Sequence, residues 1–383
     1  MVVLVGLLVA VAGQTATAYM MMPPSLLRSN NVMNKLRPAT SKVAAATLEP
    51  TKEELDARAV KVATLQQHNA ELPLGIAEEL VKSAATFGTR YLVVDNSGSM
   101  ATGDGHRLVS RLGHTGMVSC SRWDELGTSL GSLARVAVDL GAKTEFRMLN
   151  APANGSAQVV KVGGEGTAEE VQLRQVNEMV AAPPGGGTPL CKAVEQVVKD
   201  IRAQRGALER AGKRAHLVIA SDGEATDGDM AKAMKPLHDL PCSVVVRLCT
   251  DEDHVVDYWN NVDKDLELDL DILDDLQGEA KEVIANSPFL TYGAPLHGLR
   301  EFGTAFKLAD LIDERSLNRS EILELATLIF GKEAAAELPH PDLDLKGFCD
   351  GLDRIQENAP QPWNPLTNCR TPWFDTGKLA KAL

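Results

Sequence analysis

The chain has 383 residues, enough for one large domain with attachments or for two ordinary domains, and its composition of 44% hydrophobic and 24% charged residues is typical of a globular protein. Its net charge of −13 argues against a nucleic-acid-binding protein, because such a protein needs a basic face to neutralise phosphates. Beyond the N-terminus no apolar run reaches the roughly 18 residues that a membrane-spanning helix needs, so we expect no membrane span in the mature chain.

Residues 1–18 are similar to a secretory signal peptide, although they lack the usual positive residues at the start. An apolar run at 2–13 is followed by a small-residue cleavage signal at 16–18. The segment 19–50 is typical of a basic transit peptide or a disordered linker, since 19–48 contain four basic residues and no acidic one. Together the two segments resemble the bipartite presequences of algae with complex plastids, which implies a plastid location. Secretion and a single uncleaved anchor helix are the alternatives.

The segment 51–87 is expected to hold two N-terminal helices. Thr51 and Glu54 have the spacing of a capping box, which opens a helix that runs to about Asn69. A second helical stretch, Leu74–Thr86, follows a proline.

From residue 88 to about residue 290, short apolar strands alternate with amphipathic helices. This alternation predicts an α/β domain with a doubly wound, mostly parallel sheet flanked by helices, a Rossmann-like arrangement. The strand at 158–162 is expected to pair antiparallel with the strand before it, because the loop between them is short. Residues 266–272 alternate strictly and favour a last strand, with a helix as the alternative. The other expected strands are 91–94, 144–149, 216–220 and 243–248, and the expected helices are 121–140, 168–181, 189–211 and 229–238.

Residues 291–383 are expected to form a mostly helical C-terminal extension that ends in an irregular tail rich in Pro, Asp and Trp. Helical patterns cover 299–313 and 318–330. We expect Trp363 and Trp373 to pin the tail onto the domain, with a peptide-binding surface as the alternative.

Acidic residues are concentrated at 251–282, where thirteen Asp and Glu residues face only two lysines. A solvated acidic surface is the first interpretation, and a docking face for a basic partner is the second. The six cysteines form no CxxC pair, so neither a zinc site nor a disulfide framework is indicated, and we expect reduced, mostly buried thiols.

Three short loops carry the residues best suited to bind a ligand. The first is Asp95-Asn96-Ser97-Gly98-Ser99, directly after an apolar strand, and the second is Gly185-Gly186-Gly187-Thr188-Pro189, directly before a helix. The third is Ser221-Asp222-Gly223, which follows another expected strand. The carboxyl ends of parallel strands lie at one edge of a sheet, so the loops can meet there. Two carboxylates and three hydroxyls form an all-oxygen set, which suits a hard cation such as Mg²⁺.

Asp95, Ser97, Ser99, Thr188 and Asp222 resemble, in order and spacing, the metal-ion-dependent adhesion site of von Willebrand factor type A domains. The resemblance covers about residues 88–290. It implies that these five residues bind Mg²⁺ or Mn²⁺ directly or through water, and that a Glu or Asp from a partner protein completes the coordination. The residues therefore predict a cation-dependent protein-binding module.

The stretch 101–120 departs from that family, in which a helix begins almost immediately after the first loop. We expect a solvated loop beside the metal face, where it shapes the choice of partner. A second, softer metal site formed by His106, His114 and Cys120 is the alternative, although their spacing is not that of paired ligands.

Signatures of catalysis are missing from the sequence, so we expect a binding protein and not an enzyme. There is no phosphate-binding GxxxxGK[ST] loop, no GxSxG nucleophile motif and no HExxH zinc motif. Two alternatives stay open: an accessory docking subunit of a separate ATP-driven assembly, and a metal-assisted phosphoesterase. The second would need a general base, for which Glu224 and Asp227 are the acids nearest in sequence.

The presequence hypothesis has a direct test. Residues 1–50 fused to a fluorescent reporter should carry the reporter into plastids of an alga with complex plastids, as seen by fluorescence microscopy. A fusion that starts at residue 19 lacks the signal-peptide-like segment and should not enter the plastid. A full-length fusion that stays in the cytosol would contradict the hypothesis.

Overall fold

A computed structural model of the chain describes residues 51–111, 114–250, 252–266 and 270–383. The segments 1–18 and 19–50, for which targeting roles are expected, lie outside the described residues. Thr51–Leu383 form one compact unit. None of the helices in the described ranges has the length and apolarity that crossing a bilayer requires.

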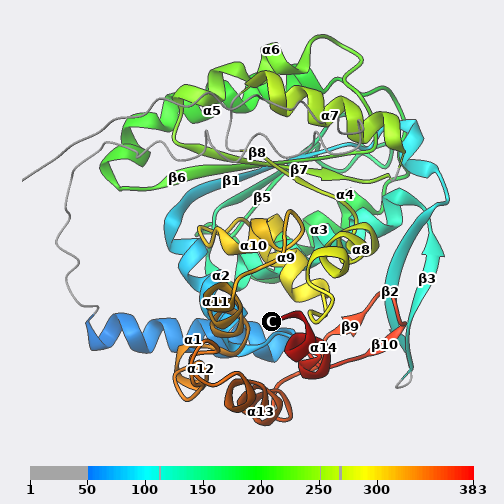
Figure 1. The fold of residues 1–383 in the computed structure, drawn as a ribbon. Helices are drawn as coiled ribbons and strands as arrows, with labels where there is room; N and C mark the ends of the chain where they lie inside the picture. Colours follow the sequence, from blue (N-terminus) through cyan, green and yellow to red (C-terminus); the bar gives the residue numbers. More distant parts are fainter. Residues whose placement is uncertain (1–50, 112–113, 251, 267–269) are drawn as a thin grey trace, which may run out of the picture. The chain divides into compact units, whose positions relative to one another are not determined.

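A mostly parallel sheet of six strands forms the centre of this unit (Figure 1). The strand order is β5-β4-β1-β6-β7-β8, and every neighbouring pair is parallel except β4 with β5. The mixed α/β class and the antiparallel pairing of the strand at 158–162 are thereby confirmed. The strands are β1 (Phe87–Val94), β4 (Thr144–Met148), β5 (Val159–Val162), β6 (Arg214–Ser221), β7 (Cys242–Leu248) and β8 (Leu270–Leu273).

Helices cover both faces of the sheet because successive strand residues point to opposite sides. In β1, Tyr91 and Val93 pack into a core beneath α5 (Leu190–Arg210), α6 (Met230–Met234) and α7 (Asp253–Leu266). Leu92 and Val94 point the other way, into a larger core with α3 (Arg122–Leu140) and α4 (Glu169–Val180). Figure 1 shows α5, α6 and α7 on one side of the sheet and α3 on the other.

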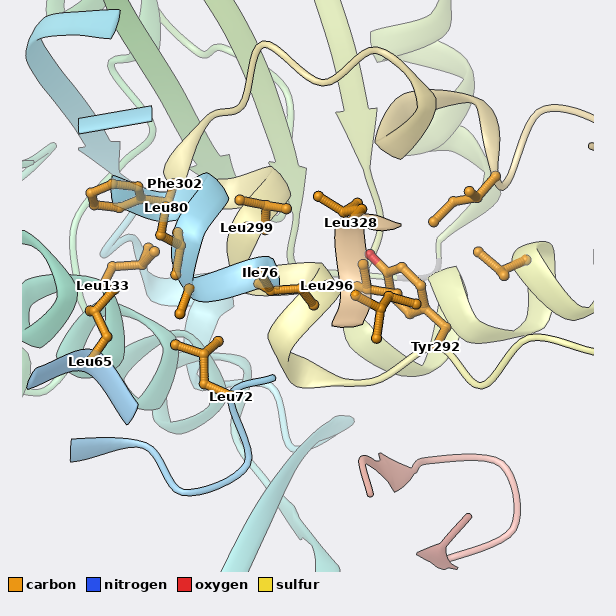
Figure 2. Close-up of a cluster of buried hydrophobic side chains, with 14 of the residues drawn as sticks. Leu65, Leu72, Ile76, Leu80, Leu133, Tyr292, Leu296, Leu299, Phe302 and Leu328 are labelled. Carbon is orange, nitrogen blue, oxygen red and sulfur yellow. The ribbon is translucent and has the colours of Figure 1, made fainter. Parts of the chain in front are cut away.

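The larger core also contains the N-terminal helices and the C-terminal extension. Thr51 and Glu54 form the expected capping box. Figure 2 shows Leu65, Ile76 and Leu80 beside Leu133 of α3 and side chains of the extension. One continuous core therefore joins both ends of the unit to the same face of the sheet. The helices involved are α1 (Lys52–His68), α2 (Leu74–Thr86), α8 (Leu276–Asn286), α9 (Ala294–Phe302), α10 (Leu308–Leu311), α11 (Arg319–Phe330) and α12 (Lys332–Ala335).

The C-terminal tail is more regular than expected. It contains α13 (Leu345–Gln356), a small antiparallel pair of strands and α14 (Thr376–Ala382); the strands are β9 (Trp363–Asn364) and β10 (Cys369–Arg370). The indoles of Trp363 and Trp373 are buried, and Trp373 Nε1 donates to the Pro360 carbonyl at 2.7 Å. Burial of both indoles fits the expected pinning role.

Two expected helices are interrupted. The helix predicted for 229–238 is α6 followed by a 3₁₀ helix, η3 (Lys235–Asp239), because Pro236 lacks an N–H for the α-helical ladder. The pattern at 299–313 is divided into α9 and α10 at Gly303, whose φ of 87° no ordinary side chain favours. Helix α7 was not predicted, because its acidic residues made the stretch resemble a solvated acidic surface and its helical apolar pattern was not recognised.

The stretch 101–120 is a β-hairpin, so the expected solvated loop is wrong. After a short 3₁₀ helix, η2 (Gly98–Ala101), strand β2 (Gly105–Arg111) pairs antiparallel with β3 (His114–Cys120). Val109 and Val118 are β-branched residues, which favour strands. Residues that pair directly across the two strands share a face of the hairpin. His106 pairs with Ser119 and His114 pairs with Arg111, so the two histidines lie on opposite faces. This register does not support the softer metal site.

A buried arginine fastens the extension to the sheet. Arg300 of α9 donates to Glu279 at 2.5 Å, to Asp313 at 2.8 Å and to Asp271 of β8 at 3.2 Å. Its side chain is fully buried. Without this cation, the carboxylate of Glu279 would be left buried beside that of Asp313.

We therefore expect Arg300→Ala to lower the free energy of unfolding by about 3–5 kcal/mol, because it leaves buried carboxylates unpaired. Arg315→Ala, which removes an exposed partner of Glu321, should cost less than about 1 kcal/mol. Urea denaturation of the two variants measures both values. Equal losses would show that the Arg300 cluster contributes no more than a surface ion pair.

Candidate metal centre

Parallel pairing of β1 with β6 brings two of the three predicted loops together. The two strands are neighbours at the point where the strand order changes direction, which is where open α/β sheets form ligand crevices. Asp95 follows β1 and Asp222 follows β6. The Asp95 N–H donates to the Ala220 carbonyl at 2.9 Å, so the ladder continues into the first loop.

A chain of short hydrogen bonds connects four of the five predicted ligands. The hydroxyls of Ser97 and Ser99 lie 3.0 Å apart, and Ser99 donates to Asp222 Oδ1 at 2.8 Å. The Ser97 N–H donates to Asp95 Oδ1 at 2.8 Å. On the other carboxylate oxygen, Asp95 accepts from the Ser221 hydroxyl at 2.6 Å. Ser221 is thus a positioning residue that sequence reasoning did not assign to the site.

The spacing of these oxygens fits a small divalent cation. Mg²⁺ binds oxygens at about 2.0–2.1 Å in octahedral order, which places adjacent ligands about 2.8–3.0 Å apart. The Ser97–Ser99 and Ser99–Asp222 contacts have separations in this range. The same separations are ordinary for O–H···O hydrogen bonds, so the side chains are compatible with such an ion as they stand.

The glycine loop with Thr188 is fastened to the first loop through the backbone. The Gly185 N–H donates to the Asn96 carbonyl at 2.7 Å, and the Gly98 N–H donates to the Gly186 carbonyl at 3.2 Å. Thr188 is nearly buried, and its hydroxyl makes no hydrogen bond to the residues that the structure describes. The backbone contacts thus place the loop that carries Thr188 beside the loop that carries Ser97 and Ser99.

Asn150, after β4, holds the first loop and the glycine loop together. Its side-chain amide donates to the Gly187 carbonyl at 2.8 Å, and its N–H donates to Asn96 Oδ1 at 2.8 Å. Asn96 in turn donates to the Asn150 carbonyl at 3.0 Å. Neither asparagine was assigned to the site from the sequence, because each acts through a contact between distant loops.

The centre carries concentrated negative charge in a buried place. Burial raises the pKa of Asp95, and the nearby charge of Asp222 adds to this, whereas hydrogen bonds from Ser221 and Ser97 oppose it. A bound cation would offset the cost of placing two carboxylates together.

Arg122, the first residue of α3, supplies part of the compensating charge. Its guanidinium donates to Asp222 Oδ2 at 3.0 Å, to Asp104 at 2.6 Å and to Glu252 at 2.8 Å. Asp222 therefore uses one oxygen for Arg122 and turns the other toward Ser99. Sequence reasoning missed Arg122, because its partners come from three loops far apart in the chain.

Neighbouring acids have structural explanations. Asp227 accepts from the N–H groups of Cys191 and Lys192 at 3.0 Å each and so caps α5.

In the described ranges, one group of three acidic side chains lies close enough to share an ion: Glu279, Glu282 and Asp313. Two of these accept hydrogen bonds from Arg300, whose guanidinium occupies the space between them.

Comparisons with known proteins give only distant likenesses. No protein-family model matches the chain, and no curated protein matches it. Among solved structures, the pilus adhesin SpaC from Lactobacillus rhamnosus GG is 15% identical with a TM-score of 0.34, over 49% of this chain and 28% of that one. The PilB minor pilin from Streptococcus sanguinis is 10% identical with a TM-score of 0.36, over 60% of this chain and 62% of that one. Likeness at this level assigns neither a family nor a function.

The glycine loop offers a matched pair of substitutions. Gly186 has a φ of 98°, and a Cβ there would lie 2.6 Å from Asn150 Oδ1, whereas a Cβ on Gly185 would meet nothing within 4 Å. We expect Gly186→Ala to lower the free energy of unfolding by about 1–3 kcal/mol through backbone strain and displacement of Asn150. Gly185→Ala should be nearly neutral. Thermal unfolding measures the difference, and equal melting temperatures would contradict the expected strain.

Proposed function

We propose that this chain is a divalent-cation-dependent protein-binding module with the fold of a von Willebrand factor type A domain. The observation that carries the proposal is the convergence of two hydroxyls and two carboxylates, those of Ser97, Ser99, Asp95 and Asp222, at the carboxyl ends of β1 and β6. The strand order supports it as well, because a doubly wound sheet in which Asp95 and Asp222 follow neighbouring parallel strands is the arrangement that this resemblance implies.

Each of the five residues has a distinct part in this proposal. Ser97, Ser99 and Thr188 offer neutral hydroxyl ligands, while Asp95 and Asp222 hold the ion directly or through water. Ser221 and Arg122 orient the two carboxylates from outside the ligand set. When Mg²⁺ or Mn²⁺ is bound, it supplies a positive centre that attracts a carboxylate. An acidic side chain from a partner protein would then complete the coordination.

A binding role is better supported than hydrolysis. Metal-assisted phosphoester cleavage needs a base beside the ion to activate water. Asp227 is engaged in capping α5, and Glu224 is an exposed loop residue. The ligand set that we propose is also rich in hydroxyls, which leaves the ion electrophilic toward an incoming carboxylate.

The proposal predicts that Asp95→Asn weakens Mg²⁺ binding by more than about tenfold, because it removes a negative charge from the ligand set while keeping its shape. Isothermal titration calorimetry of the full chain measures the affinity. Asp239→Asn, which changes a carboxylate that is 84% exposed, is the matched control and should bind as the wild type does. Equal affinities of the wild type and Asp95→Asn would show that the cation binds elsewhere or not at all.

A further inference from the structure

We propose that the exposed face of the β2–β3 hairpin is a docking surface for an acidic, extended segment of the partner protein. The inference rests on the proposed function, because the same partner would deliver the carboxylate to the cation. Its own evidence comes from the composition, the exposure and the attachment of the hairpin.

Alternate residues of the hairpin form one basic and apolar face, named here the arginine–valine face. In antiparallel strands, directly paired residues point to the same side. Arg107 pairs with Val118, and Val109 pairs with Gly116, so these four residues share a face with Arg111. Val109 is 37% exposed and Val118 is 42% exposed, and both arginines are exposed as well. The two valines lie on neighbouring strands of this one face and give it apolar surface beside the arginines.

The charge of this face indicates what it binds. Neither β2 nor β3 contains an acidic residue, although the whole chain has a net charge of −13. Arg107 and Arg111 form no ion pair within the described part of the chain. Two unpaired guanidinium groups beside two valines complement a segment that carries carboxylates and β-branched residues. A basic segment would be repelled.

The hairpin is fastened directly to the candidate metal centre. Thr102 donates to the Ser99 carbonyl through both its N–H, at 2.9 Å, and its hydroxyl, at 2.7 Å. Asp104 is held by Arg122, which also holds Asp222. Gly105 lies against α3 so closely that a Cβ would be 2.7 Å from the Ser121 carbonyl oxygen. The position of the hairpin is therefore fixed relative to Ser99 and Asp222.

The hairpin has a length suited to a short peptide segment. Seven residues of β2 extend about 20–24 Å from its base at a rise of about 3.4 Å per residue. An extended segment of about seven to ten residues can therefore lie along the arginine–valine face while a carboxylate near its end reaches the cation. The hairpin thus selects the partner, and the cation supplies the anchor.

The test uses two fluorescent peptides of ten residues, one alternating Glu and Val and the other alternating Lys and Val. Each is titrated with the full chain in Mg²⁺, and binding is followed by fluorescence anisotropy. The acidic peptide should bind the wild type and the basic peptide should not. The double variant Arg107→Glu/Arg111→Glu should bind the acidic peptide at least about tenfold more weakly.

Two further variants separate the surface from general effects of charge or folding. Gly116→Glu adds an acidic side chain where a Cβ meets nothing within 4 Å, so it should block the face without disturbing the hairpin. Arg202→Glu/Arg205→Glu makes the same charge change on exposed residues of α5 and should leave peptide binding unchanged. The proposal is overturned if the acidic peptide fails to bind the wild type, or binds the hairpin variants as tightly.

Calorimetry with Mg²⁺ on the same variants keeps this inference distinct from the proposed function. Hairpin variants should retain the Mg²⁺ affinity of the wild type, whereas Asp95→Asn should lose it. If Asp95→Asn loses Mg²⁺ but the hairpin variants bind the peptide normally, the docking surface alone is wrong. If Asp95→Asn keeps Mg²⁺, the proposed function is wrong whatever the hairpin does. Sedimentation that reveals a dimer broken by Arg107→Glu/Arg111→Glu would assign the face to self-association and overturn the partner proposal.

Discussion

The parallel pairing of β1 with β6 is the constraint on which the candidate site depends. It fixes Asp95 and Asp222 at one edge of the sheet, although 126 residues separate Asp95 from Ser221, the hydroxyl that orients it. Buried apolar side chains on both faces of these two strands hold the pairing in register. A shift of one residue would turn those side chains to the wrong faces, so the core that stabilises the fold also sets the geometry of the oxygens.

Sequence reasoning found the parts of the site that are encoded locally. Asp95, Ser97, Ser99 and Asp222 could be predicted to meet, because each follows an apolar strand and parallel strands end at a common edge. Arg122 and Ser221 could not, because their roles exist only in contacts between segments far apart in the chain. The hairpin at 105–120 was missed because polar residues occur on both faces of its strands, so apolar and polar residues do not alternate clearly along the sequence. The fold class was predictable for the same reason as the meeting of these side chains: both depend on periodicity within single segments.

Arg122 makes the candidate centre part of a wider electrostatic network. One guanidinium contacts carboxylates on the loop after β6, at the base of the hairpin and just before α7. Removing Arg122 would leave the carboxylate of Asp222 buried without the guanidinium that pairs with it. It would also remove the ion pair with Asp104 that holds the base of the hairpin. A substitution at this position therefore changes two properties together, the charge at the centre and the attachment of the neighbouring surface. It should not be used to assign a role to either one alone.

The core shared by the two ends of the folded unit also has a consequence for biosynthesis. Ile76 and Leu80 of α2 are covered by side chains of α9 and α11, which are synthesised much later than α2 (Figure 2). The apolar side of α2 must therefore stay exposed to water until α9 and α11 have been synthesised. During that interval the nascent chain exposes a broad apolar surface, which is the kind of surface that chaperones bind and that otherwise leads to aggregation.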